Sequence, residues 1–116
     1  MSAADRDKTL NEWILNGKAM EAFEEFYADD VQMQENSEVP RKGKPLNREY
    51  EQKFFQNLET FHGVKLLSSA IRDDVTFSEW EFDLTMKGAP RTKMSQVSVR
   101  HWKNNKVVNE RFYHNP

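Results

Sequence analysis

The spacing of the hydrophobic residues changes at Gly63, and this change constrains the fold more than any other feature of the sequence. Before Gly63, apolar side chains recur at three- and four-residue intervals, which is typical of amphipathic helices. After Gly63, apolar and polar side chains alternate, most clearly over residues 76–87, which is typical of strands with one buried face. Helices followed by strands predict an α+β fold, with helices packed on one face of a strongly bent antiparallel sheet.

The region before Gly63 is expected to contain three helices and one short strand. The helical pattern over residues 4–27 is interrupted by Asn16-Gly17, which resembles a C-cap and predicts two helices. Val31–Glu35 alternates weakly and is expected to form a short strand. Pro45 is suited to the first turn of the next helix, and Gly63 is expected to end it. The apolar stripe of that helix is Tyr50, Phe54, Leu58 and Phe61.

The region after Gly63 predicts a four-stranded meander over residues 64–72, 76–87, 93–103 and 107–114. The turns are Asp73-Asp74, Gly88-Ala89-Pro90 and the two-residue hairpin signal Asn104-Asn105. Trp80, Phe82, Leu84 and Met86 are too apolar to face water, so they define the inner face. Pairing across the turns then assigns to this face Met94, Gln96, Ser98 and Arg100, and Val108, Glu110, Phe112 and His114. A β-bulge would exchange the two faces.

Composition limits the classes of protein to which the chain can belong. Its 116 residues are expected to form one domain over residues 1–116, and 17 basic against 19 acidic residues give a net charge of −2. The charges are scattered, which disfavours nucleic-acid binding.

Cysteine is absent, and the three histidines are far apart, so we expect no disulfide, metal site or cofactor. No apolar run reaches bilayer length and the N-terminus is polar, which favours a cytoplasmic protein without membrane contact.

The high aromatic content indicates a folded domain despite the polar composition. Charged residues make up 31% of the chain and the mean hydropathy is −0.91, values that lean towards disorder. Aromatic residues nevertheless make up 12%, and disordered chains lack such residues. We therefore expect a small core built on aromatic side chains.

Four segments, taken in order, resemble a known family. They are Phe26–Val31, Trp80–Phe82, Gln96–Trp102 and Lys106–Tyr113, with a Pro- and Gly-containing loop and a helix between the first two. Over Leu10–Asn115 the chain is similar to the SnoaL-like branch of the nuclear transport factor 2-like (NTF2-like) superfamily. The resemblance implies helices against a bent sheet, a pocket at the open end of the cone, and a dimer through the outer sheet face. The superfamily includes polyketide cyclases, ketosteroid isomerase, limonene epoxide hydrolase, dehydratases and non-catalytic proteins, so it implies no single activity.

Glu35 is the foremost candidate for catalysis. The resemblance places it where ketosteroid isomerase-like sequences carry their base, and an apolar wall from Trp80 and Phe82 is expected to raise its pKa towards neutrality. The alternative is an exposed glutamate at a strand end. The other isomerase positions hold Asn11 and Ser98 instead of a tyrosine and an aspartate, so ketosteroid isomerisation is not expected.

A second group of inward-facing residues completes the expected site. His114 is a candidate acid or base beside Glu110 and Glu35, the alternative being a frayed C-terminal residue. Gln96 and Ser98 are expected to orient a ligand, or else to bond only to each other or to a buried water. The candidate apolar ligand wall is Trp80, Phe82 and Phe112, although aromatic residues are more often plain core.

Two functions from different classes remain open on the sequence. One is a cofactor-independent enzyme in which Glu35 moves a proton on a small apolar or carbonyl-containing molecule, as in a cyclase, isomerase or dehydratase. The other is a non-catalytic ligand-binding or dimerisation domain. The outer sheet face is expected to pair two subunits through Val97, Val99, His101 and Tyr113, flanked by Val107, Asn109 and Arg111.

Overall fold

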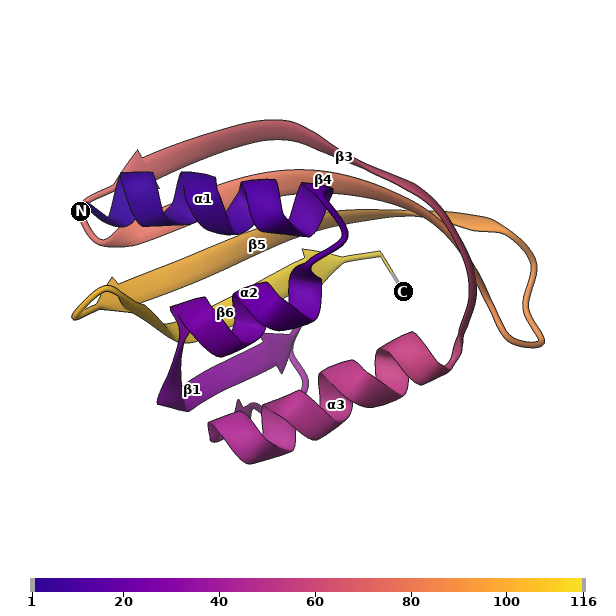
Figure 1. Cartoon of the computed structure of the whole chain (residues 1–116), viewed down its shortest axis with the longest axis horizontal. Coiled ribbons are helices and arrows are strands. Elements are labelled where there is room, and N and C mark those ends of the chain that lie inside the picture. Colours follow the sequence, from indigo (N-terminus) through magenta and orange to yellow (C-terminus); the bar gives the residue numbers. More distant parts are fainter. Residues whose placement is uncertain (1, 116) are drawn as a thin grey trace.

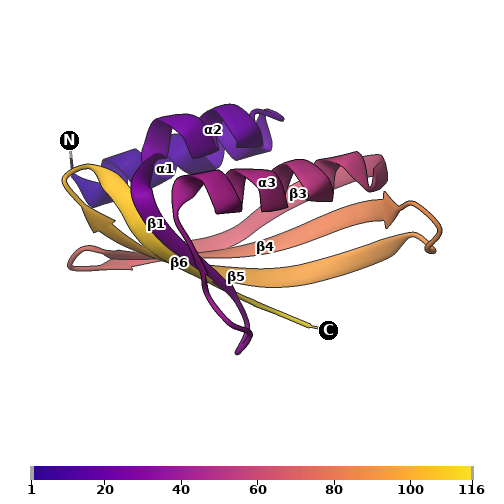
Figure 2. The ribbon, with the colours of Figure 1, turned by 90° about the horizontal axis from the view of Figure 1, so that it is seen from below.

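The computed structural model describes residues 2–115, which form three helices on one face of a six-stranded mixed sheet (Figure 1). The helices are α1 (Ala3–Leu15), α2 (Ala19–Phe26) and α3 (Lys44–Gln56). The strands are β1 (Tyr27–Glu35), β2 (Arg41–Lys42), β3 (Leu58–Arg72), β4 (Val75–Met86), β5 (Thr92–Lys103) and β6 (Lys106–His114). Figure 2 shows all three helices on the same side of the sheet, which confirms the α+β fold. None of these helices is long and apolar enough to cross a membrane.

The sheet has the strand order β2-β1-β6-β5-β4-β3. Strands β3 to β6 form the expected antiparallel meander. The N-terminal strand β1 pairs with β6 in parallel, so the sheet is mixed rather than wholly antiparallel. The two-residue strand β2, within the expected loop, pairs with β1 at Gln32 and Met33.

The helix α3 ends seven residues earlier than the sequence predicted. It stops at Gln56, and Leu58 and Phe61 belong to β3, where they pair with Met86 and Leu84. The apolar residues of an inward strand face happen to continue the helical spacing of Tyr50 and Phe54, so spacing alone could not locate the boundary. Consequently Gly63 lies inside β3, and His62 is a strand residue rather than the end of a helix.

The inner sheet face is largely the one that strand alternation predicted. Met94 pairs with Phe82, Gln96 with Trp80, and Ser98 with Ser78. The assignment of Val108 to this face is wrong, because the β5–β6 register shifts between His101 and Trp102 and makes Val108 a bulged residue. Val107 instead enters the core, where it is fully buried.

The core lies where α1 and α2 cover β1, β5 and β6. Its buried members are Leu10, Ala22, Phe23, Phe26, Tyr27, Val31, Met33, Trp102 and Val107. Trp13 packs edge-on against Phe26 with ring centroids 5.2 Å apart, as expected for a core rich in aromatic residues. The outer face, away from the helices, carries Val97 opposite Tyr113 and Val99 opposite Arg111.

Candidate functional site

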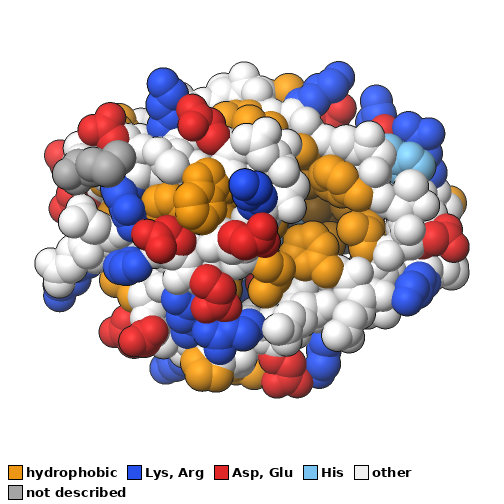
Figure 3. Space-filling view, in the orientation of Figure 1, with side chains coloured by type: hydrophobic (Ala, Val, Ile, Leu, Met, Phe, Trp, Pro, Cys, Tyr) orange, Lys and Arg blue, Asp and Glu red, His pale blue; other side chains and the backbone are white. Residues whose placement is uncertain are grey.

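The open end of the fold is hollow. Figure 3 shows hydrophobic side chains around a depression between α3 and the end of α1, in the orientation of Figure 1. The parallel strands β1 and β6 both end on this side of the sheet, with Glu35 opposite Phe112. Side chains from α3, β1, β5 and β6 therefore meet here.

Glu35 lies in a short chain of charged groups. Its Oε2 atom accepts a hydrogen bond from Arg41 Nη2 at 2.9 Å, and its Oε1 atom is 3.5 Å from His114 Nε2. The side chain is 13% exposed, so Glu35 is neither a frayed nor a free surface residue. The Arg41 cation stabilises the carboxylate and opposes the desolvation on which the sequence argument for Glu35 rested.

Besides Glu35, two neighbours hold Arg41 in place. Its guanidinium stacks on the Tyr50 ring at 3.5 Å, and its Nε donates to Asn47 Oδ1 at 3.1 Å. Asn47 is fully buried and donates to the carbonyl groups of Gly43, Arg41 and Val31. Asn47 thereby joins the start of α3 to β1 and β2, which sets the rotation of the helix about its axis.

Glu51 is the carboxylate that this rotation turns inward. Lys44, Asn47, Glu51 and Phe54 fall on the less exposed face of α3, at helical spacing. Burial raises the pKa of Glu51 to about 7, with further repulsion from Glu110 and Glu35 and partial relief from Arg41. Within residues 2–115 no hydrogen bond or ion pair holds this carboxylate. Glu51 is therefore available to take up or release a proton near neutral pH.

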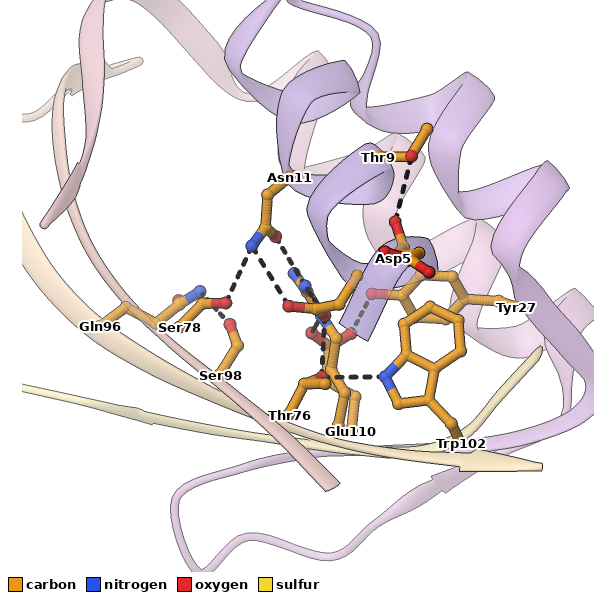
Figure 4. A network of polar contacts seen from close by, with 12 residues as sticks. Asp5, Thr9, Asn11, Tyr27, Thr76, Ser78, Gln96, Ser98, Trp102 and Glu110 are labelled. Carbon is orange, nitrogen blue, oxygen red and sulfur yellow. Dashed lines mark hydrogen bonds and ion pairs between the residues drawn. The ribbon is translucent and has the colours of Figure 1, made fainter. Parts of the chain in front are cut away.

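A buried polar network lies between α1 and the sheet (Figure 4). Arg100 is its centre: the guanidinium donates to Glu110 Oε2 at 2.7 Å, Asp7 Oδ1 at 2.8 Å and Asn11 Oδ1 at 2.7 Å. The remaining contacts are Tyr27 to Glu110, Thr76 to Asp7, Asn11 to Ser78, and Trp102 to Thr76. Every buried side-chain polar atom among the described residues has a partner.

The network contains two carboxylates and one guanidinium. Burial raises the pKa of Glu110, although Arg100 and Tyr27 partly offset this effect. Burial and the neighbouring Glu110 also raise the pKa of the Tyr27 hydroxyl. Burial alone would lower the pKa of Arg100, but Glu110, Tyr27 and Asp7 outweigh it and the pKa lies above its usual value. Arg100 is therefore the fixed cation of the network.

Several residues expected to line the pocket are covered by their neighbours. Trp80 is 1% exposed and stacks on Phe82 with centroids 5.8 Å apart, while Phe112 packs against the core. Ser98 is buried and accepts from Gln96 at 3.4 Å, which matches the alternative that the two bond to each other. Gln96 and His114 are half-buried partners across the β5–β6 ladder, and both line a depression of about 230 Å³.

The sequence reasoning missed Glu51, Arg41 and the central role of Arg100. The signal for Glu51 was its spacing of four residues from Asn47 and seven from Lys44, which defines a helix face offset from that of Tyr50. The signal for Arg100 was stronger, because alternation placed Arg100 and Glu110 on the same inner face of adjacent strands. Two opposite charges on a buried face predict an ion pair.

A known protein family matches nearly the whole chain. The model of the SnoaL-like domain family matches residues 1–114. No curated protein matches the sequence. One similar structure is a protein from Mesorhizobium loti, which is described as a SnoaL-like polyketide cyclase, with carbohydrate phosphatase in brackets. The two sequences are 30% identical and the structures superpose with a TM-score of 0.90. The match covers 97% of this chain and 99% of that chain.

Two more distant structures share the fold. A Bacillus subtilis protein described as an isomerase is 16% identical with a TM-score of 0.79, over 98% of this chain and 86% of that chain. A Catenulispora acidiphila protein with a ketosteroid isomerase-like fold, solved with trimethylamine, is 14% identical with a TM-score of 0.73, over 87% and 78% of the two chains. The family match spans nearly the whole sequence and agrees with the architecture, so the chain belongs to the SnoaL-like family and has an NTF2-like fold.

Proposed function

We propose that this protein is a small-molecule enzyme that catalyses cofactor-independent proton transfer, of the isomerase, cyclase or dehydratase type, with Glu51 as its acid–base group. The observation that carries the proposal is the unpaired Glu51 carboxyl on the inner face of α3, with a pKa of about 7. A group whose pKa lies near the working pH is well suited to both remove and return a proton.

The proposed reaction begins at a carbon next to a carbonyl group. The Glu51 carboxylate takes the proton from this carbon, and the electron pair of the C–H bond moves into the carbon–carbon bond as the carbonyl oxygen gains negative charge. Gln96 and His114 donate hydrogen bonds to that oxygen, and His114 Nε2 lies 3.5 Å from Glu35 Oε1. Glu51 then returns the proton to the same or another carbon.

The family supports a reaction of this class without naming a substrate. The 30% identical relative is described as a polyketide cyclase, and a more distant one as an isomerase. The apolar rim of the hollow in Figure 3 favours an apolar body for the substrate.

The test is the exchange of acidic C–H protons for deuterium in a panel of small ketones and β-keto esters. We expect the wild-type protein to speed exchange for at least one compound and Glu51→Gln to slow it by about two to four orders of magnitude. Glu49→Gln is the matched control, because Glu49 lies exposed on the same helix and pairs with Lys53. Equal rates for the wild-type protein and Glu51→Gln would contradict the proposal.

A non-catalytic ligand-binding role is the second candidate. It is favoured by the buried Trp80–Phe82 stack, which fills part of the expected pocket as ordinary core. Under this alternative the wild-type protein binds members of the ketone panel but does not speed their deuterium exchange above the rate in buffer alone. Measuring both exchange and binding therefore separates the two functions.

A further inference from the structure

A groove of about 460 Å³ lies between α1 and β3, separate from the residues around Glu51 and Glu35. Figure 1 shows α1 and β3 running alongside each other, and the groove separates them. Its volume lies within the range of about 300–1,000 Å³ that is usual for small-molecule sites. The proposed proton transfer does not use any of the residues that line it.

The walls of the groove are apolar and incompletely covered. Leu15 at the end of α1 and Ile71 near the end of β3 are 41% and 46% exposed, and Leu66 also lines the groove. Leu66 and Ile71 face the helix side of the sheet, because they pair with the inward residues Trp80 and Thr76. An apolar ligand lying here would remove these side chains from water.

The floor of the groove is polar and has unused acceptor capacity. Asp7 is only 5% exposed, and its Oδ1 atom accepts hydrogen bonds from both Thr76 and Arg100 at 2.8 Å. Its Oδ2 atom accepts one long hydrogen bond, from Asn11 at 3.3 Å. A carboxylate oxygen has two lone pairs, so Oδ2 can accept a stronger hydrogen bond from a donor in the groove.

The charges around the groove favour a cation. Beneath it, Asp7 and Glu110 share the single Arg100 guanidinium, and Glu12 adds a carboxylate to the lining. Lys8 and Glu12 both have exposed side chains, so solvent screens their opposite charges. A positively charged donor is attracted to the buried Asp7 carboxylate, whereas an anion is repelled by it at low dielectric.

We infer that the α1–β3 groove is a binding site for a small amphipathic amine. The ammonium group donates to Asp7 Oδ2, and the apolar body lies against Leu66 and Ile71. No residue of this site takes part in the proposed proton transfer, so a negative result for one proposal leaves the other intact.

The experiment compares three probes with closely similar apolar bodies: phenethylamine, phenethyl alcohol and hydrocinnamate. Each is titrated into the wild-type protein, and binding is followed by amide chemical shifts in NMR. We expect the amine to shift amides of residues 7–12 and 66–71, the alcohol to bind about tenfold more weakly, and the carboxylate not to bind. Amine shifts confined to α3 and β6, equal affinity for hydrocinnamate, or no shifts at about 10 mM amine would overturn the inference.

Variants on the exposed wall keep the test independent of the buried network. Ile71→Lys places a like charge in the groove, and Ser69→Trp fills it; we expect each to weaken amine binding at least about tenfold with little change in melting temperature. Leu67→Lys is the matched control, since Leu67 is an exposed residue of β3 outside the lining. Unchanged affinity in both groove variants, or equal losses in Leu67→Lys, would refute the assignment.

Discussion

Replacing Glu51 by glutamine should make the protein more stable at neutral pH, although it removes the proposed catalytic group. Glutamine keeps the shape of the side chain and its capacity for hydrogen bonds, but it has no charge to desolvate. In the wild-type protein the carboxylate form of Glu51 is opposed by burial and by the charges of Glu110 and Glu35. The folded state therefore binds the Glu51 proton more tightly than the unfolded chain does.

The size of the effect follows from the pKa of this group in the two states. Folding raises the pKa of Glu51 from 4.5 to about 7. The contribution of this group to the free energy of unfolding is therefore fully present below pH 4.5 and is lost as the pH rises through 7. One pKa unit corresponds to about 1.4 kcal/mol, which sets an upper limit of about 3–4 kcal/mol for this rise. Glu51 is half-buried and solvent screens part of the repulsion, so we expect about 1–2 kcal/mol.

Urea unfolding at a series of pH values, followed by tryptophan fluorescence, measures this effect. The free energy of unfolding of Glu51→Gln should equal that of the wild-type protein near about pH 4 and exceed it by about 1–2 kcal/mol near about pH 8. The exposed control Glu49→Gln should differ little from the wild-type protein at any pH. A difference between Glu51→Gln and the wild-type protein that stays constant over this range would refute the raised pKa of Glu51.

Three further predictions concern other parts of the molecule. Arg100→Met leaves two buried carboxylates without their cation, so we expect a loss of about 3–5 kcal/mol in the free energy of unfolding, measured with urea. His114→Leu should slow deuterium exchange about a hundredfold while leaving the melting temperature nearly unchanged, because it removes one donor to the developing oxyanion. The apolar outer face is proposed to pair two copies of the chain, so light scattering should give a dimer mass for the wild-type protein and a monomer mass for Val99→Lys. A wild-type monomer at micromolar concentration would contradict the last prediction.

Local patterns predicted the hairpins and most of the inner face of the sheet. The signal Asn104-Asn105 corresponds to a turn in which both residues have positive φ, 52° and 65°, as a two-residue hairpin of this type requires. Alternation anchored on Trp80 placed Gln96, Ser98 and Arg100 correctly, because every side chain on a regular strand follows once one is fixed.

The features that the sequence did not reveal depend on contacts between distant segments. The bulge at Val108 arises where β5 and β6 meet, and neither strand alone carries a signal for it. The parallel pairing of β1 with β6 joins segments separated by most of the chain. The inward position of Glu51 depends on Asn47, whose buried hydrogen bonds to Gly43, Arg41 and Val31 set the rotation of α3.

The place of β6 in the sheet has a consequence for how the chain is made. This strand lies between β1 and β5, and it contributes the fully buried Val107 and Glu110. Until residues 106–114 have left the ribosome, β1 lacks its parallel neighbour and Tyr27 lacks its hydrogen-bond partner, so the nascent chain exposes an unpaired strand edge beside apolar residues. We therefore expect folding to complete only after β6 has been synthesised, and products truncated before β6 to aggregate or be degraded rather than persist as partly folded domains.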